Sequence, residues 1–157
     1  MKIQNTDGFN SLPLPKIIDM YIGLLHLHSN LPYLLLVLLA IVLVNSLMGW
    51  LQSKPFGKRS KKLIFWAMLT AHIQWTVGAI LYFVSPQVKS MSLAMGDSLS
   101  RLYALEHPLL MTIALVLITI ARSKTKKSED NKHHKTSFLF FAMALVCILL
   151  CLPPSWL

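Results

Sequence analysis

Histidine is the residue type whose placement in this sequence points to chemistry. His72 lies near the middle of the apolar stretch Leu63–Val84, and His107 lies near the start of another apolar stretch that ends at Ala121. A polar group in hydrocarbon costs free energy unless it has a partner, so an ionisable residue at such a depth usually faces the interior of a helix bundle. Imidazoles on two facing helices can bind a haem iron from its two sides. His72 and His107 are therefore our first candidate pair of metal ligands.

The composition is that of a membrane protein. The chain has 157 residues, of which 55% are hydrophobic and 13% are charged, and its mean hydropathy is +0.58. A soluble domain carries roughly a quarter charged residues. Of the 15 Lys and Arg residues, five lie at positions 54–62 and six at positions 122–135, and both clusters flank apolar stretches. This is the positive-inside pattern rather than a basic face for nucleic acid, so we expect a lipid bilayer as partner and no nucleic acid.

The apolar stretches also predict the fold class. They indicate four membrane-spanning helices, at about residues 31–51, 63–84, 102–121 and 137–152. The short loops between them predict an all-α, antiparallel up-down-up-down bundle over residues 31–157, preceded by a surface segment at residues 1–30. The basic clusters follow the first and third spans, so we expect both clusters in the cytoplasm and both termini on the non-cytoplasmic side.

The start of the first span is predicted from cap residues. Ser29 and Asn30 are favourable N-cap residues, and Pro32 suits the first turn of a helix. They predict a helix that starts near Leu31. The apolar residues 17–28 before it then form either an interfacial segment or an extra turn of that helix.

The predicted topology gives each histidine a depth. At about 1.5 Å of rise per residue, His72 lies roughly 18 Å and His107 roughly 9 Å below the non-cytoplasmic surface. His26 and His28 lie before the first predicted span, at or near the same surface. Either of them with His107 is a rival to the pair of His72 with His107, and the depths fit both choices. The two histidines at positions 133–134 fall in the second basic loop, where we expect solvated side chains.

Other residues near these histidines are of the types that a haem pocket uses. Gly78 on the second span and Ala104 on the third are small enough to admit a flat ring. Arg101, Lys89 and Tyr103 lie near the non-cytoplasmic surface, where haem propionates could reach cations and hydroxyls. We therefore count Arg101 and Tyr103 among the candidate cofactor-binding residues.

Two neighbours of His107 have roles that the sequence suggests. Glu106 can orient His107 by a hydrogen bond, or it can form an ion pair with Arg101 at the membrane surface. Pro108 has no N–H, so it frees the carbonyl of Ala104, and a kink of this kind opens space in a membrane bundle.

The histidines also have a purely structural interpretation. His72 as a neutral imidazole can hydrogen-bond a neighbouring helix and serve helix association, and His107 near the surface can be structural as well. No C-x-x-C-H motif occurs in the sequence, which excludes a covalently attached c-type haem.

Three segments between Tyr21 and Ser123 resemble the small four-helix bacterial membrane proteins of the cytochrome b-like type. The segments are GLLHLHSNLPYLLLVLLAIV, AHIQWTVGAILYFVSP and ALEHPLLMTIALVLITIARSK. The pieces that carry the resemblance, LLHLHS, HIQ and EHP, fall on the histidines named above: His26, His28, His72 and His107. Many proteins of this type have an Arg where this chain has Pro32. The resemblance implies haem b as cofactor and a multi-pass protein of the bacterial inner membrane.

We expect, from the histidines together with the resemblance, an integral membrane b-type cytochrome. It would pass electrons between a quinol or another redox protein and an acceptor at the non-cytoplasmic face. With so little mass outside the membrane, it would be a homo-oligomer or a redox subunit of a larger membrane complex rather than a stand-alone enzyme. The alternative is an accessory or scaffold subunit without a cofactor, whose histidines only hold helices together and which would be colourless.

Overall fold

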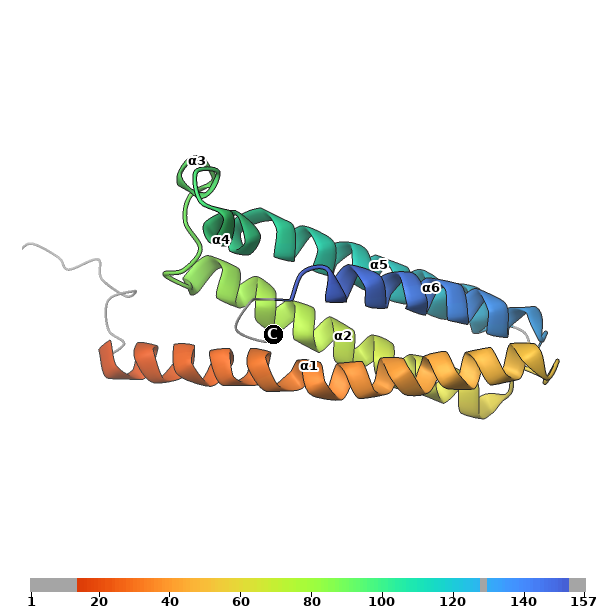
Figure 1. The fold of residues 1–157 in the computed structure, drawn as a ribbon. Helices are drawn as coiled ribbons and strands as arrows, with labels where there is room; N and C mark the ends of the chain where they lie inside the picture. The colour runs from red at the N-terminus through yellow and green to blue at the C-terminus, as the bar shows by residue number, and fades with distance from the viewer. Residues whose placement is uncertain (1–13, 128–129, 153–157) are drawn as a thin grey trace, which may run out of the picture.

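The computed structural model describes residues 14–127 and 130–152, and these residues are helical apart from short connections (Figure 1). The helices are α1 (Leu14–Leu51), α2 (Lys58–Val84), α3 (Met91–Ala94), α4 (Ser98–Arg101), a π-helical segment η1 (Leu102–Glu106), α5 (His107–Thr125) and α6 (Lys132–Leu149). No strand occurs in the described ranges. The all-α fold class predicted from the sequence is confirmed.

Three helical stretches are long and apolar enough to cross a membrane. They are Ile18–Leu51, Lys58–Val84 and Ser98–Thr125. Helix α6 has 18 residues, and its first turn carries Lys132 and Lys135. The three long apolar helices indicate membrane insertion. A fourth span at 137–152 and the placement of the termini stay predictions.

Helix α1 is longer than the sequence predicted. It begins at Leu14, so the expected helix start near Leu31 is wrong, and residues 17–28 extend the first helix instead of forming a separate interfacial segment. Pro32 lies inside this helix. Proline has no N–H, so the carbonyl four residues before it, that of His28, has no helical donor and must find another.

Ser29 and Asn30 do not cap a helix start. The hydroxyl of Ser29 donates to the carbonyl of Leu25 at 2.8 Å, and the amide of Asn30 donates to the carbonyl of His26 at 2.7 Å. Side chains of these types bond to backbone carbonyls one turn earlier when the helix continues through them. The same residues therefore suit a helix interior next to a proline as well as a helix start.

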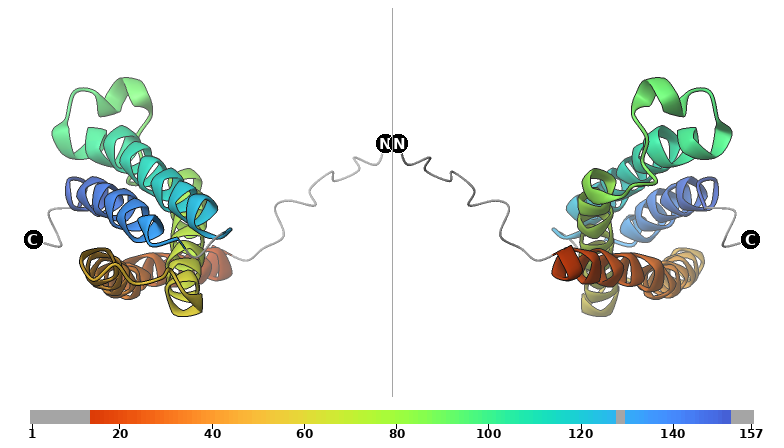
Figure 2. Two further views of the ribbon diagram at one scale, coloured as in Figure 1. Left: turned by 90° about the vertical axis from the view of Figure 1, so that its right-hand side faces the viewer. Right: turned by 90° about the vertical axis from the view of Figure 1, so that its left-hand side faces the viewer.

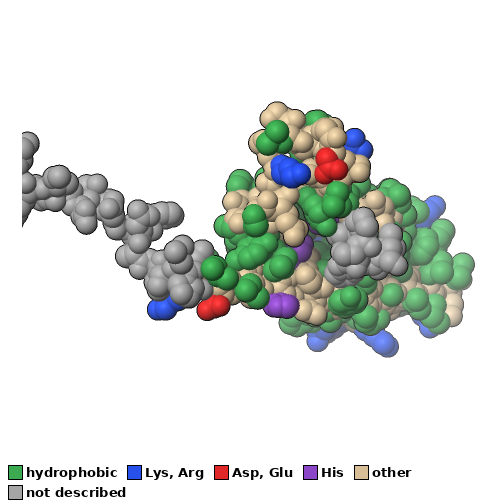
Figure 3. All heavy atoms as spheres, turned by 60° about the vertical axis from the view of Figure 1, so that its left-hand side comes forward, with side chains coloured by type: hydrophobic (Ala, Val, Ile, Leu, Met, Phe, Trp, Pro, Cys, Tyr) green, Lys and Arg blue, Asp and Glu red, His purple; other side chains and the backbone are tan. Residues whose placement is uncertain are grey.

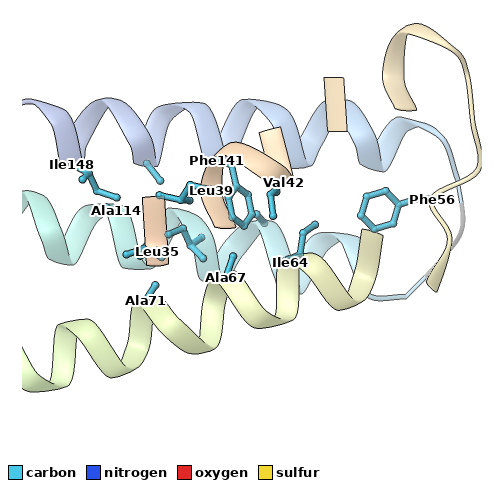
Figure 4. Close-up of a cluster of buried hydrophobic side chains, with 13 residues drawn as sticks. Leu35, Leu39, Val42, Phe56, Ile64, Ala67, Ala71, Ala114, Phe141 and Ile148 are labelled. Atoms are coloured by element: carbon cyan, nitrogen blue, oxygen red, sulfur yellow. The ribbon is translucent and has the colours of Figure 1, made fainter. Parts of the chain in front are cut away.

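The four long helices surround a common core. Helix α1 packs against α2 and α6, and α5 packs against the same two helices. Figure 2 shows this order end-on, with α2 on one side of the bundle and α6 between α1 and α5 on the other. Figure 4 shows the core, which comes from all four helices and the α1–α2 connection: Leu35, Leu39, Val42, Phe56, Ile64, Ala67, Ala71, Ala114, Ile118, Ala121, Phe141, Ala144 and Ile148. The five alanines among them let the helix backbones approach closely.

The outer surface of the bundle is apolar. Large hydrophobic side chains are exposed on every long helix, with Phe83 of α2 at 85% and Leu51 of α1 at 73%. Hydrophobic side chains cover much of the face seen in Figure 3. Soluble monomers rarely expose apolar patches of this extent, whereas a lipid-facing surface is expected to be apolar. The surface thus agrees with insertion into a membrane.

One end of the bundle, which we call the basic end, carries both clusters of Lys and Arg and contains a buried histidine. His134 in the first turn of α6 is only 2% exposed, and its ring centre lies 4.8 Å from that of the fully buried Phe56. Its ring occupies the space that Gly49 leaves, since a Cβ at Gly49 would collide with the imidazole. The expectation of a solvated side chain is therefore wrong for His134, because α6 begins at Lys132 and turns this ring into the bundle.

Candidate functional site

A cavity of about 710 Å³ lies between α1, α2 and α5, toward the end of the bundle that carries α3 and α4. Its wall is mostly apolar, and α6 and the residues after it contribute only Ile148 and Leu152. Helix α6 ends at Leu149, so among the described residues no helix covers the fourth side of the bundle at this level. The volume lies within the range of about 300–1,000 Å³ that is usual for small-molecule and cofactor pockets.

Two histidines from different helices meet at this cavity. The ring centres of His28 on α1 and His107 on α5 are 6.2 Å apart, with an angle of 75° between the ring planes. Both side chains are partly buried, and both line the cavity. The structure thus brings together one of the rival pairs that the sequence left open.

The other candidate histidines lie elsewhere. His72 is not among the residues that line the cavity, and its Nδ1 hydrogen-bonds the carbonyl of Met68 on its own helix at 2.8 Å. Its backbone carbonyl accepts a hydrogen bond from the hydroxyl of Thr76 at 2.8 Å. His26 is exposed on α1. Neither His72 nor His26 is brought to His107.

His107 is positioned by an irregular stretch of helix. It follows the π-helical segment η1, and Pro108 comes directly after it. Pro108 leaves the carbonyl of Ala104 without a helical donor, and the hydroxyl of Tyr82 on α2 donates to this carbonyl at 3.1 Å. A π-helical turn inside an α-helix often marks a functional site, and here it directly precedes His107.

The hydrogen bond of His107 determines where its proton lies. Its Nδ1 is 3.0 Å from the backbone carbonyl of Cys151, which follows the end of α6. A carbonyl only accepts, so Nδ1 carries the proton and donates it. In the neutral ring, Nε2 of His107 then has a free lone pair. This is the arrangement in which histidines ordinarily bind metals, with the second ring nitrogen donating to a carbonyl.

His28 is held from α2 by Gln74. The amide nitrogen of Gln74 is 2.9 Å from the backbone carbonyl of His28 and 3.1 Å from its Nδ1. The carbonyl is the one that Pro32 leaves without a helical N–H. Gln74 therefore satisfies that carbonyl and contacts the imidazole of the same residue.

Gly78 provides the space for the His28 ring. A Cβ at this position would lie 2.8 Å from Cε1 of His28, closer than real Cβ atoms approach a neighbour. From the sequence, we expected the small size of Gly78 to make room for a flat cofactor. In the structure its immediate neighbour is the histidine itself, and Gly78 also lines the cavity.

The charged residues near His107 pair with each other. Nε of Arg101 is 2.7 Å from Oε1 of Glu106, and both side chains are more than two-fifths exposed. Of the two roles expected for Glu106, the structure shows the ion pair. The carbonyl of Cys151, and not Glu106, accepts the hydrogen bond that orients His107. Tyr103 lines the cavity, whereas Arg101 does not.

Sequence reasoning missed three partners of the site, namely Gln74, Tyr82 and the carbonyl of Cys151. A signal for the first two exists. Each proline inside a membrane helix frees the carbonyl four residues earlier, and in hydrocarbon that carbonyl needs a donor from a neighbouring helix. Gln74 and Tyr82 lie on the same helix and supply these donors for Pro32 and Pro108.

In the part of the chain that the structure describes, we find no site at which protein side chains alone would bind a metal ion. No group of three or more His, Cys, Asp or Glu side chains comes together there. The arrangement that is present consists of two imidazoles from different helices that contact each other at an apolar cavity. Comparison with protein-family models, curated proteins and solved structures gives no match to this chain.

Proposed function

We propose that this chain is an integral membrane b-type haem protein of the electron-transfer class. The haem would be held in the cavity between α1, α2 and α5 by His107, through Nε2, and by His28. The proposal includes a fourth membrane span formed by α6, in an antiparallel bundle with both termini on the non-cytoplasmic side. It also includes the bacterial inner membrane, which the resemblance implies.

One observation carries the proposal, the approach of the His28 and His107 rings to 6.2 Å at the wall of the cavity. Two imidazoles bound to one metal ion through nitrogens about 2 Å from it have ring centres roughly 6 Å apart. The rings come from two different helices, as the two sides of a haem require.

The residues of the chain have separate tasks in this proposal. His107 offers a lone pair at Nε2, and its Nδ1–H on the carbonyl of Cys151 fixes the ring and raises its basicity as a ligand. The apolar wall excludes water, which influences the reduction potential of a bound haem. The Tyr103 hydroxyl at the cavity is a donor for a carboxylate. Haem itself supplies one-electron chemistry, which we expect to connect a quinol or redox protein with an acceptor.

The proposal is tested by the colour of the purified protein. Cells supplied with haem should yield protein with stoichiometric haem b and sharp bands in the reduced-minus-oxidised visible spectrum. His107→Ala should lose most of this haem. His72→Ala and His26→Ala are matched controls, since both remove a histidine of the same chain outside the cavity, and they should keep it. A colourless, folded wild-type protein would instead support the cofactor-free accessory subunit.

A further inference from the structure

A second pocket, of about 350 Å³, lies at the basic end between α5 and α6. Two lysines from different helices line it, Lys124 of α5 and Lys132 of α6, and the other lining residues belong to α6: His133, Thr136, Leu139 and Phe140. The polar residues of α6 come first along the helix, and the apolar ones follow. The pocket therefore changes from cationic and polar at the end of the bundle to apolar toward its middle.

The two lysines offer positive charge that the described residues neutralise only in part. Nζ of Lys132 lies 2.8 Å from Oδ2 of Asp130. An ammonium group has three hydrogens, so Lys132 can donate to a second acceptor as well. Among the described residues, no carboxylate forms an ion pair with Lys124. An anion in the pocket would therefore meet two ammonium donors, one of them with a charge that no described carboxylate balances.

An exposed apolar stripe continues from this pocket along α6. It is formed by four side chains that lie on one side of the helix, because they are spaced four, three and four residues apart: Leu139, Met143, Val146 and Leu150. At about 1.5 Å of rise per residue, the stripe is roughly 16 Å long. The hydrocarbon layer of one leaflet is about 15 Å thick, half of a core of about 30 Å. The stripe thus matches the acyl chains of one leaflet in length.

We propose that this pocket binds one anionic phospholipid of the leaflet at the basic end, with its phosphate between Lys124 and Lys132 and an acyl chain along the apolar stripe. Charge favours this occupant, because a phosphate accepts hydrogen bonds from both ammonium groups, whereas a zwitterionic headgroup brings a cation that the lysines repel. A soluble phosphate would leave the stripe unused. The inference goes beyond the proposed function and holds for the chain with or without haem.

Lipids bound to the full chain in detergent can be counted by native mass spectrometry. The probes are dioleoyl phosphatidylglycerol and, as its zwitterionic counterpart, dioleoyl phosphatidylcholine. Wild type should bind one phosphatidylglycerol in preference to phosphatidylcholine. In Lys124→Gln/Lys132→Gln the affinity for phosphatidylglycerol should fall by about tenfold or more, with that for phosphatidylcholine unchanged, because both charges of the pocket are removed. Lys126→Gln/Lys127→Gln is the matched control, since it removes the same charge from exposed lysines that do not line the pocket.

Lys124→Gln alone is a second variant, which keeps the ion pair of Lys132 with Asp130 and should lose part of the same affinity. Equal losses in the two double variants would overturn the inference, because the basic end would then attract anionic lipid without a specific pocket. A wild-type protein that does not distinguish the two lipids would overturn it as well. Displacement of phosphatidylglycerol by glycerol 3-phosphate, which has no acyl chains, would contradict the lipid as occupant and assign the pocket to a soluble phosphate.

Discussion

The side-chain amide of Gln74 donates to the backbone carbonyl of His28 at 2.9 Å. This hydrogen bond joins α2 to α1 at the turn where Pro32 withholds a helical N–H. The hydroxyl of Tyr82, also on α2, does the same for α5, where Pro108 withholds the N–H from Ala104. Each proline thus creates an acceptor, and α2 supplies both donors. The two bonds fix α1 and α5 on either side of the cavity, close to the histidines that line it.

The Tyr82 bond should contribute measurably to stability. Tyr82→Phe removes the donor to the carbonyl of Ala104, and we expect a loss of about 1 kcal/mol. In a Pro108→Ala background the backbone N–H is restored and can replace the hydroxyl, so the same substitution should cost clearly less. Thermal unfolding of the four proteins in detergent measures this coupling. Equal costs in both backgrounds would show that the tyrosine does not compensate for the proline.

Gly78 should be required for the position of His28. Gly78→Ala puts a Cβ 2.8 Å from Cε1 of His28, so the ring has to move. Overpacking of this kind costs about 1–3 kcal/mol, which corresponds to a loss in haem affinity from about fivefold to about a hundredfold if the site is as proposed. Titration with haemin gives the affinity. Gly23→Ala on α1 is the control because nothing lies within 4 Å of its Cβ; a similar loss there would argue against the displacement of His28.

Gly49 and His134 should be coupled at the basic end. A Cβ at Gly49 would collide with the His134 ring, so Gly49→Ala should destabilise the protein by about 1–3 kcal/mol. The effect should largely disappear when His134→Ala is already present, because the space is then free. Gly57→Ala in the α1–α2 connection, which follows α1, is a control because nothing lies within 4 Å of its Cβ. A cost that persists without the imidazole would mean that the backbone at Gly49 and not the histidine is responsible.

Acidification should loosen the same end of the bundle. Burial lowers the pKa of His134 from its usual value of 6.5, the neighbouring His133 lowers it further, and the carbonyl of Pro55 acts in the opposite direction. The unfolded chain then binds a proton more readily than the folded one, so the stability is complete above pH 6.5 and declines as the pH falls below it. Unfolding temperatures at a series of pH values should show this decline in wild type, and it should be smaller in His134→Gln. An identical decline in both would assign it to other groups.

The ends of the first two long helices could be predicted from the sequence, but the starts of the helices could not. The first and second helices end at Leu51 and Val84 as expected, where polar residues and prolines follow an apolar stretch. The predicted helix start near Leu31 is wrong because Ser29 and Asn30 next to a proline suit a helix interior as well as an N-cap. Local residue types could not decide between these two structures. The decision depends on Gln74, which supplies a donor from another helix.

The candidate site could be predicted as a set of histidines but not as a pair. Depth along the membrane places His72 and His107 inside the bundle and His28 at or near its non-cytoplasmic surface, and it contains no information about rotation around a helix axis. The structure turns His28 and His107 to the same cavity and leaves His72 on the backbone of its own helix. The burial of His134 depends likewise on the missing side chain of Gly49, which is distant in the sequence.

The most direct test of the account is the haem content of His107→Ala compared with that of His72→Ala. Both proteins would be purified in parallel from cells supplied with haem, and haem b would be quantified per folded chain. His72→Ala should contain as much haem as wild type, and His107→Ala should contain little. Loss of haem in His72→Ala with full retention in His107→Ala would contradict the account, because the ligand would then lie outside the cavity between α1, α2 and α5.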